Sequence, residues 1–260
     1  MGTLIGADPE FFVERDGKIV PVFGLLGGSK SKPRTVRDGA LQEDNVLAEI
    51  NIKPAATAMD FIRNIGIVRQ QLDEVLNPYH SLVASTHFFE EDILLNNPQS
   101  FAFGCEPDLN CWTQQPNIKP SPVTTMRSAG GHVHIGYDNP TPEKSFAIAA
   151  MCDIFMGIPS VMLDEDRQRR SLYGKAGACR IKPYGVEYRA LSNFWLGSPM
   201  LMYWVFNTAV SCANTSHKLQ SIMEYIDPTK VQRIINEYDK DEAVRVVKDL
   251  KITIPRGPSL

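Results

Sequence analysis

Acidic, histidine and arginine side chains recur along this sequence in pairs separated by one residue. The pairs are Asp8 with Glu10, Glu49 with Asn51, Glu106 with Asp108, His132 with His134, and Glu187 with Arg189. Residues i and i+2 of a β-strand lie on the same face, so each pair predicts two polar side chains on one face of a strand. Carboxylate and imidazole groups bind metal cations, and guanidinium groups bind phosphate.

A solvent-exposed sheet face also alternates polar and apolar residues, but its polar positions usually carry Thr, Lys, Gln and Ser. Here those positions carry almost only Asp, Glu, His, Asn and Arg. Carboxylates that are crowded on one face repel each other unless a cation neutralises them. The pairs therefore predict a charged, cation-binding sheet face, with helices packed behind it.

Magnesium suits such a face better than zinc. Mg²⁺ neutralises carboxylates, retains several water ligands and bridges to substrate phosphates. Zinc hydrolases more often carry a motif such as H-E-x-x-H, which this sequence lacks. His132 and His134 are the only close pair of histidines, and zinc binding by that pair is the less favoured alternative.

Several arginines follow one another closely and offer ligands for phosphate. They are Arg169, Arg170, Arg180 and Arg189. Guanidinium groups bind phosphate oxygens in a bidentate manner, and Arg189 shares its predicted strand face with Glu187. Arg167 and Arg169 fit at least as well at a solvated helix end, where they would form local ion pairs.

The common nucleotide-binding and nucleophile motifs are absent. Lys30-Ser31 resembles the end of a P-loop, but Ser29 stands where that motif requires glycine. No G-x-G-x-x-G or G-x-S-x-G sequence occurs, so a nucleotide would be held by metals and arginines. Cys179, beside Arg180, is the best candidate for a cysteine nucleophile, although a buried and inert cysteine is the favoured interpretation.

The pairs fall within segments that are typical of strands. The predicted strands are Leu4–Phe12, Asn45–Ile52, Phe103–Trp112, Gly131–Tyr137 and Tyr184–Leu191. Apolar residues and helix-start signals predict helices over Thr57–Leu76, Pro142–Met156, Pro199–Tyr225, Lys230–Tyr238 and Asp241–Leu250. The segment from Gly24 to Pro33 is rich in Gly, Ser and Lys and predicts a loop.

Composition and length indicate a globular protein with a sizeable core. Of its 260 residues, 43% are hydrophobic and 22% are charged. No convincing linker divides the chain, so we predict one domain over residues 1–260, with a helical C-terminal part from about residue 199. The net charge of -3 gives no reason to expect nucleic acid or a membrane as partner.

Cysteine usage and apolar patterning indicate a cytoplasmic protein. The five cysteines are odd in number and include no C-x-x-C pair, which disfavours a disulfide framework. The N-terminus lacks the basic start and the long apolar stretch of a signal peptide. The most apolar stretch, from Phe146 to Leu163, is interrupted by Asp153 and Pro159, and it predicts buried helices.

The order of the motifs resembles that of a known superfamily. The motifs are G-A-D-P-E-F-F from Gly6, A-E-I-N from Ala48, G-C-E-P from Gly104 with Trp112, G-G-H-V-H-I-G from Gly130, and G-V-E-Y-R from Gly185. This ordered set is similar to the glutamine synthetase and glutamate–cysteine ligase superfamily, and most of all to the small COOH-NH2 ligases of tailed phages. The resemblance implies an α+β, glutamine-synthetase-like fold. Helices would cover one face of a largely antiparallel, curved sheet, with the active site on the other face.

The resemblance also implies roles for single residues. The implied metal ligands are Asp8, Glu10, Glu49, His132 and Glu187. The implied nucleotide-binding residues are His134, Arg170, Arg180 and Arg189, and the implied catalytic residues are Arg180, Glu187 and Arg189. No role is implied for Glu43, Asn51, Glu106 or Asp108.

The implied activity is that of an ATP- and magnesium-dependent carboxylate–amine ligase, with manganese as an alternative metal. The terminal phosphoryl group of ATP would move to a carboxylate, and an amine would then displace phosphate from the acyl phosphate. The implied partners are a small-molecule or peptide carboxylate and an amine. The implied location is the host cytoplasm if the chain is phage-encoded. Assembly into a homo-oligomer is left open. Two alternatives also stay open: a metal-dependent hydrolase that uses no ATP, and a non-catalytic virion-associated protein that keeps the fold.

Overall fold

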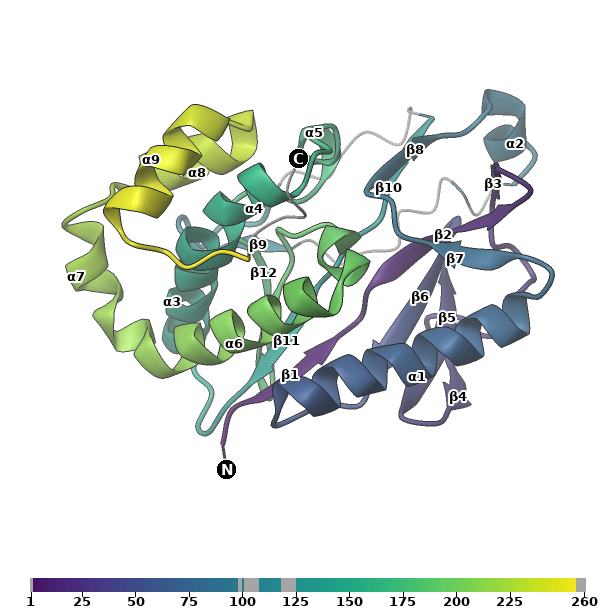
Figure 1. The fold of residues 1–260 in the computed structure, drawn as a ribbon, viewed down its shortest axis with the longest axis horizontal. Coiled ribbons are helices and arrows are strands. Elements are labelled where there is room, and N and C mark those ends of the chain that lie inside the picture. Colours follow the sequence, from purple (N-terminus) through teal and green to yellow (C-terminus); the bar gives the residue numbers. More distant parts are fainter. Residues whose placement is uncertain (1, 98–99, 101–107, 118–124, 256–260) are drawn as a thin grey trace.

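The computed structural model describes residues 2–97, 100, 108–117 and 125–255. Its strands form two main sheets and a small ribbon, shown in Figure 1. The five-stranded sheet has the order β1 (Leu4–Ala7), β11 (Val133–Gly136), β13 (Gly185–Tyr188), β12 (Ala178–Lys182) and β9 (Leu109–Asn110). The six-stranded sheet has the order β3 (Lys18–Val20), β2 (Glu10–Arg15), β6 (Leu47–Ile52), β5 (Gly39–Asp44) and β4 (Arg34–Val36), with β7 (His80–Leu82) paired to β2. The ribbon consists of β8 (Thr86–Phe88) and β10 (Met126–Ser128).

The prediction of a mixed fold with antiparallel strands is confirmed, since all pairs of strands among the described residues are antiparallel. The single strand predicted over Leu4–Phe12 is wrong. The chain leaves β1 at Asp8, passes Pro9 and enters β2 in the other sheet. Proline has no N–H group for a ladder, so it suits this change of sheet. The carbonyl of Pro9 still accepts a hydrogen bond from the N–H of Ile50, at 3.1 Å.

The helices of the described residues are α1 (Ala58–Leu76), α2 (Glu91–Leu95), α3 (Pro142–Cys152), α4 (Ile158–Leu163), α5 (Arg169–Leu172), α6 (Pro199–Thr215), α7 (Leu219–Met223), α8 (Pro228–Glu237) and α9 (Lys240–Asp249). Helices α1, α8 and α9 begin and end close to their predicted limits. The helix predicted over Pro142–Met156 ends at Cys152, and a 3-10 turn at Ser216–Lys218 divides the helix predicted over Pro199–Tyr225. Thr57 caps α1 through its side chain, and Ser198 and Asp227 cap α6 and α8 in the same way. A proline in the first turn of α3, α6 and α8 reinforces these starts.

Helices α1, α3 and α6 cover the sheets and fill the main core. Helix α1 packs on β5, β6 and β7, α3 packs on β12 and β13, and α6 packs on β1 and β11 (Figure 1). Phe61 of α1 stacks on Trp195 with ring centroids 5.9 Å apart, and both residues belong to the main core. Burial of this apolar surface fixes the sheets beside each other.

The apolar segment Pro142–Leu163 is long and apolar enough to cross a membrane, but 72% of its most apolar window is buried inside the protein. The prediction of buried helices here is confirmed. A π-helical turn at Asp153–Gly157 separates α3 from α4. Helices α8 and α9 then pack on α4 through a second apolar cluster that includes Ile158 and Ile234.

Candidate active site

Two groups of metal-ligating side chains lie where the two sheets join. Asp8, His132 and Glu187 form the first cluster, in which the ligand atoms lie within 4.8 Å of one another. Glu10, Asp44 and Glu49 form the second cluster, within the same distance. Asp8 and Glu10 stand on either side of Pro9, so the change of sheet gives one carboxylate to each cluster.

Strand register explains the composition of the clusters. In the five-stranded sheet His134 is paired with Glu187 of β13, and Glu187 is also paired with Arg180 of β12. In the six-stranded sheet Glu10 of β2 is paired with Glu49 of β6. Side chains of directly paired residues lie on the same face, so register brings these groups together from distant parts of the chain.

Both histidines hold Asp8 in its ionised form. The Nε2 atom of His134 lies 3.0 Å from Asp8 Oδ1, and the Nδ1 atom of His132 lies 3.4 Å from it. Burial alone would raise the pKa of Asp8, but the two imidazole groups outweigh burial and hold this pKa below its ordinary value. Burial likewise lowers the pKa of His134, but Asp8 outweighs it and the net pKa is raised.

Three cations surround Glu187, which is almost fully buried. The guanidinium of Arg189 contacts Glu187 Oε1 directly, Arg180 Nη1 lies 3.5 Å from that atom, and Lys182 Nζ lies 3.0 Å from Oε2. Burial raises the pKa of Glu187, but the charges of Arg189, His132 and His134 together outweigh it and the pKa falls to about 2. Glu187 is therefore a carboxylate at any physiological pH.

Glu49 is the least favourable charge of the second cluster. Burial raises its pKa well above the ordinary value, and the charges of Asp8, Asp44 and Glu10 raise it further. Glu10 accepts a hydrogen bond from the Gly130 N–H at 2.5 Å, and Lys30 Nζ lies 3.0 Å from Asp44 Oδ2. Among the residues that the structure describes, Lys30 is the one cation in an ion pair with these three carboxylates, so the second cluster carries excess negative charge.

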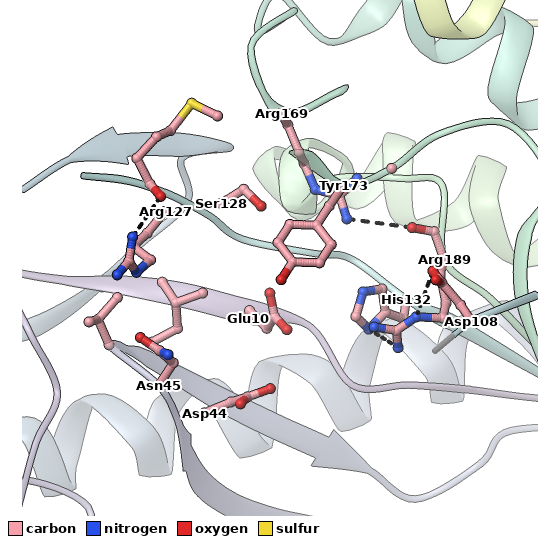
Figure 2. A pocket seen from close by; sticks show the side chains of 14 residues that line it. Glu10, Asp44, Asn45, Asp108, Arg127, Ser128, His132, Arg169, Tyr173 and Arg189 are labelled. Atoms are coloured by element: carbon pink, nitrogen blue, oxygen red, sulfur yellow. Dashed lines mark hydrogen bonds and ion pairs between the residues drawn. The ribbon is translucent and has the colours of Figure 1, made fainter. Parts of the chain in front are cut away.

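A small pocket of about 70 Å³ lies beside the clusters and is shown in Figure 2. Its polar lining includes Glu10, Asp44, Asp108, His132, Arg127, Arg169, Tyr173 and Arg189. Tyr173 points toward Glu10, while His132, Arg189 and Asp108 gather on one side and Arg127 lies with Asn45 on the other (Figure 2). Val46, Leu47 and Met126 add apolar walls.

The two clusters fit a hard divalent cation. Asp8 Oδ1 and Glu187 Oε2 are buried carboxylate oxygens, and each lies 3.0 Å from a nitrogen atom, of His134 and Lys182 respectively. The first cluster offers two carboxylates and one imidazole, and the second offers three carboxylates. Such oxygen-rich sets match the ligands of magnesium or manganese better than those of structural zinc. A cation would also relieve the repulsion that raises the pKa of Glu49.

A family model for phage phiEco32-like COOH-NH2 ligases of type 2 matches residues 121–258, which are 138 of the 260 residues. The chain belongs to this family. No curated protein has a detectable match to the sequence. The family description names a ligase that acts on a carboxylate and an amine. The match includes His132, Arg169, Glu187 and Arg189 and excludes Asp8, Glu10 and Glu49.

Most residues that the sequence singles out in this COOH-NH2 ligase family member come together in the structure. They are Asp8, Glu10, Glu49, His132, His134, Arg180, Glu187 and Arg189. Arg170 is placed elsewhere: it donates to Ser160 Oγ at 2.8 Å, and its guanidinium stands 5.4 Å from the centre of the Tyr238 ring. The solvated helix end considered for Arg169 is wrong, because Arg169 is buried and lines the pocket.

Sequence patterns missed two further residues of the site, Asp44 and Lys182, and left two alternative roles for Arg169. Asp44 ends β5 and precedes Asn45, whose left-handed φ of 58° forms the turn into β6, and this turn signal was readable in the sequence. Lys182 follows Arg180 at the two-residue spacing of a strand face. Nothing local distinguished Arg169 from Arg170, since both belong to the short helix α5.

The remaining candidates have simpler roles. Glu43 accepts hydrogen bonds from Gly24 N and Leu26 N, at 3.1 and 3.0 Å, and so anchors the loop before β4. Asp108 Oδ2 lies 3.6 Å from Arg189 Nε, and Glu106 is outside the described residues. Cys179 is fully buried and burial raises its pKa to about 12, so it is unsuited to act as a nucleophile.

Proposed function

We propose that this protein is an ATP- and magnesium-dependent ligase that joins a carboxylate to an amine through an acyl phosphate, on a glutamine-synthetase-like fold. One observation carries the proposal: two adjacent carboxylate clusters share a pocket with buried arginines, in a chain that belongs to a COOH-NH2 ligase family. Phosphoryl transfer relies on charge neutralisation and positioning, which such a set of groups can supply.

In this proposal the first and second clusters hold the metal. The ligands are Asp8, Glu10, Glu49, His132 and Glu187, with Asp44 as an addition to that set. Bound Mg²⁺ would neutralise phosphate charge. Glu187 lies on β13, His132 directly precedes the adjacent strand β11, and Glu49 lies on β6 of the other sheet. Strands or their immediate ends therefore support these ligands.

Three cations would bind the phosphate oxygens. Arg180 and Lys182 lie two residues apart on β12, and Arg189 follows directly after β13. All three stand around Glu187. Guanidinium groups bind phosphate in a bidentate manner, and the lysine adds a point charge. His134, which contacts Asp8 and the Tyr184 hydroxyl, would face the nucleotide.

The proposed reaction has two steps. A carboxylate oxygen attacks the terminal phosphorus of ATP, and the bond from that phosphorus to the ADP oxygen breaks. The nitrogen of a neutral amine then attacks the acyl carbon, the carbon–oxygen bond to phosphate breaks, and the nitrogen loses a proton. The products are an amide, ADP and phosphate.

Magnesium-dependent ADP release, measured with pools of carboxylates and amines, tests the proposal. We expect release that requires both pools, and a loss of at least about 100-fold in the Glu187→Gln variant. Glu91→Gln, at an exposed position of α2, is the matched control and should retain wild-type activity. ADP release equal in wild type and Glu187→Gln across a broad screen would reject the proposal. Metal-dependent hydrolysis of esters or peptides without ATP would favour the hydrolase alternative instead.

A further inference from the structure

Arg169 is a buried cation in the wall of the pocket. Its side chain is 3% exposed, and it lines the pocket together with Arg189 and Tyr173. Its Nη1 atom donates to the Ala190 carbonyl at 3.0 Å and its Nη2 atom to the Arg189 carbonyl at 3.4 Å, as Figure 2 shows in part. The Nε–H group is buried and has no hydrogen-bond partner among the described residues.

The charge of Arg169 lacks a close counter-ion in the described part of the chain. No carboxylate there lies within the 4.0 Å of an ion pair with it, whereas Arg189 contacts both Glu187 and Asp108. Burial lowers the pKa of Arg169 to about 10; Glu10 raises it from a longer distance, and Arg170 lowers it. Buried charges are normally paired, so an unpaired guanidinium in a pocket wall calls for an anion.

The local backbone makes room for this guanidinium. Gly174 has a left-handed φ of 70°, and a Cβ atom at that position would stand 1.8 Å from Arg169 Nη1. Only glycine allows the turn after α5 to pass so close to the side chain. The turn therefore holds Arg169 against the carbonyl groups that end β13 and beside the pocket.

The size of the pocket limits what the anion can be. The volume of this pocket is about 70 Å³. A carboxylate or a single phosphoryl group is small enough to reach Arg169 there.

We propose that Arg169 binds a small oxyanion in this pocket, next to Arg189. The inference rests on the proposed function for the source of the oxyanion, which is either the carboxylate of the acyl substrate or the phosphoryl group that is transferred to it. The evidence for the site itself is that Arg169 is buried, is held by two backbone carbonyl groups and has no close counter-ion among the described residues. Arg170, its neighbour in the sequence, lines a different cavity beside Tyr238 and takes no part.

Thermal unfolding in phosphate-free buffer, with sodium phosphate or sodium acetate added and sodium chloride as the ionic-strength control, tests the site without turnover. We expect one or both oxyanions to raise the unfolding temperature of wild type beyond the effect of chloride. Arg169→Met should weaken the oxyanion dependence at least tenfold, while Arg170→Met, at an equally buried position, should leave it intact. Stabilisation by phosphate alone identifies the phosphoryl group as the source, and stabilisation by acetate alone identifies the carboxylate.

A second variant tests the inference if Arg169→Met does not fold. Gly174→Ala keeps the charge but displaces the guanidinium, and it should weaken the oxyanion dependence as well. If wild type responds to neither oxyanion, or if Arg169→Met responds as wild type does, the inference is wrong. Oxyanion binding without any ADP release would support this site and would reject the proposed ligase activity instead.

Discussion

At the residue scale, the site is built from charges that oppose each other across a short distance. Glu187 is stabilised as an anion by Arg180, Lys182 and Arg189, and its pKa is about 2. Glu49 is destabilised as an anion, since burial and neighbouring carboxylates raise its pKa. Neighbouring cations thus balance the charge of Glu187 in the first cluster, whereas neighbouring carboxylates repel the charge of Glu49 in the second.

Glu49→Gln should therefore have opposite effects with and without metal. Without metal, the neutral amide removes repulsion from Asp8, Asp44 and Glu10, and it can still bond to Gln42. We expect the unfolding temperature in EDTA to rise by a few degrees, which corresponds to about 1 kcal/mol for a chain of this size. The affinity for Mg²⁺, measured from the MgCl₂ dependence of the unfolding temperature, should fall at least tenfold, because one proposed ligand is lost. A variant that is less stable in EDTA and binds magnesium normally would contradict this assignment.

Cys179 offers a test of the nucleophile alternative. Its thiol is fully buried with a pKa of about 12, so the thiolate is scarce at neutral pH. Cys179→Ala should keep ADP release within about twofold of wild type and should cost about 1 kcal/mol of stability from lost packing. Loss of activity in a Cys179→Ala variant that still unfolds in a cooperative transition would indicate a role for the thiol.

At the element scale, Asp153 ties together the segments behind the site. It opens the π-helical turn between α3 and α4, and its Oδ2 atom accepts from Trp112 Nε1 at 2.7 Å and from Gly177 N at 2.6 Å. Its Oδ1 atom accepts from the Tyr188 hydroxyl at 2.8 Å. Tyr188 is next to Glu187 on β13, so this carboxyl group fixes the strand that carries the central acid of the site.

Asp153 should make stability depend on pH. Burial raises its pKa from 3.8 to about 7, although three hydrogen bonds oppose this. Between these values the folded protein keeps a proton that the unfolded chain releases. The free energy of unfolding therefore falls as pH rises toward 7, by at most about 1.4 kcal/mol per pH unit. Urea unfolding from pH 5 to 7.5, followed by tryptophan fluorescence, measures this slope.

Asp153→Asn should flatten that slope. The amide oxygen can accept from Trp112 and Gly177, and the amide nitrogen can donate to Tyr188. Asp241→Asn, at an exposed position in the first turn of α9, is the control and should keep the wild-type slope. An unchanged slope in Asp153→Asn would assign the pH dependence to another group.

At the scale of the whole molecule, the C-terminal helices share a core with the central helical segment. Ile154, Ile158 and Val161 pack with Ile234 of α8 and Val246 of α9. Tyr238, at the end of α8, also donates a hydrogen bond to the Asp164 carbonyl at 2.5 Å. These contacts join α8 and α9 to the segment that precedes Arg169, so we expect one cooperative unit, as the single domain predicted from the sequence requires.

Ile234→Ala should test this cooperativity. Removing a fully buried isoleucine should cost about 2–5 kcal/mol. Circular dichroism and tryptophan fluorescence should show one shared transition, shifted equally in both signals. Val244→Ala, at a position that is 48% exposed, should change stability by less than about 0.5 kcal/mol. Two separate transitions would mean that α8 and α9 form an independent unit.

Local patterns in the sequence were sufficient for helices such as α1 and α8 and for most polar residues of the site. Capping residues and apolar spacing act within a few residues, and for that reason α1 and α8 begin and end near their predicted limits. Two-residue spacing likewise placed His132 with His134, and Glu187 with Arg189, on shared faces. Strands β5 and β12 were not predicted, although they are longer than β11 and β13, and Asp44 and Lys182 were missed with them.

Local sequence patterns predict the kinds of charge in the site and the main helices behind it. Tertiary structure alone decided that the chain changes sheet at Pro9, that Asp8 and Glu10 separate into two clusters, and that Arg169 rather than Arg170 reaches the pocket. The physical reason is that strand pairing and side-chain burial depend on residues far apart in the chain. Spacing within a strand gives no information about which strand lies beside it.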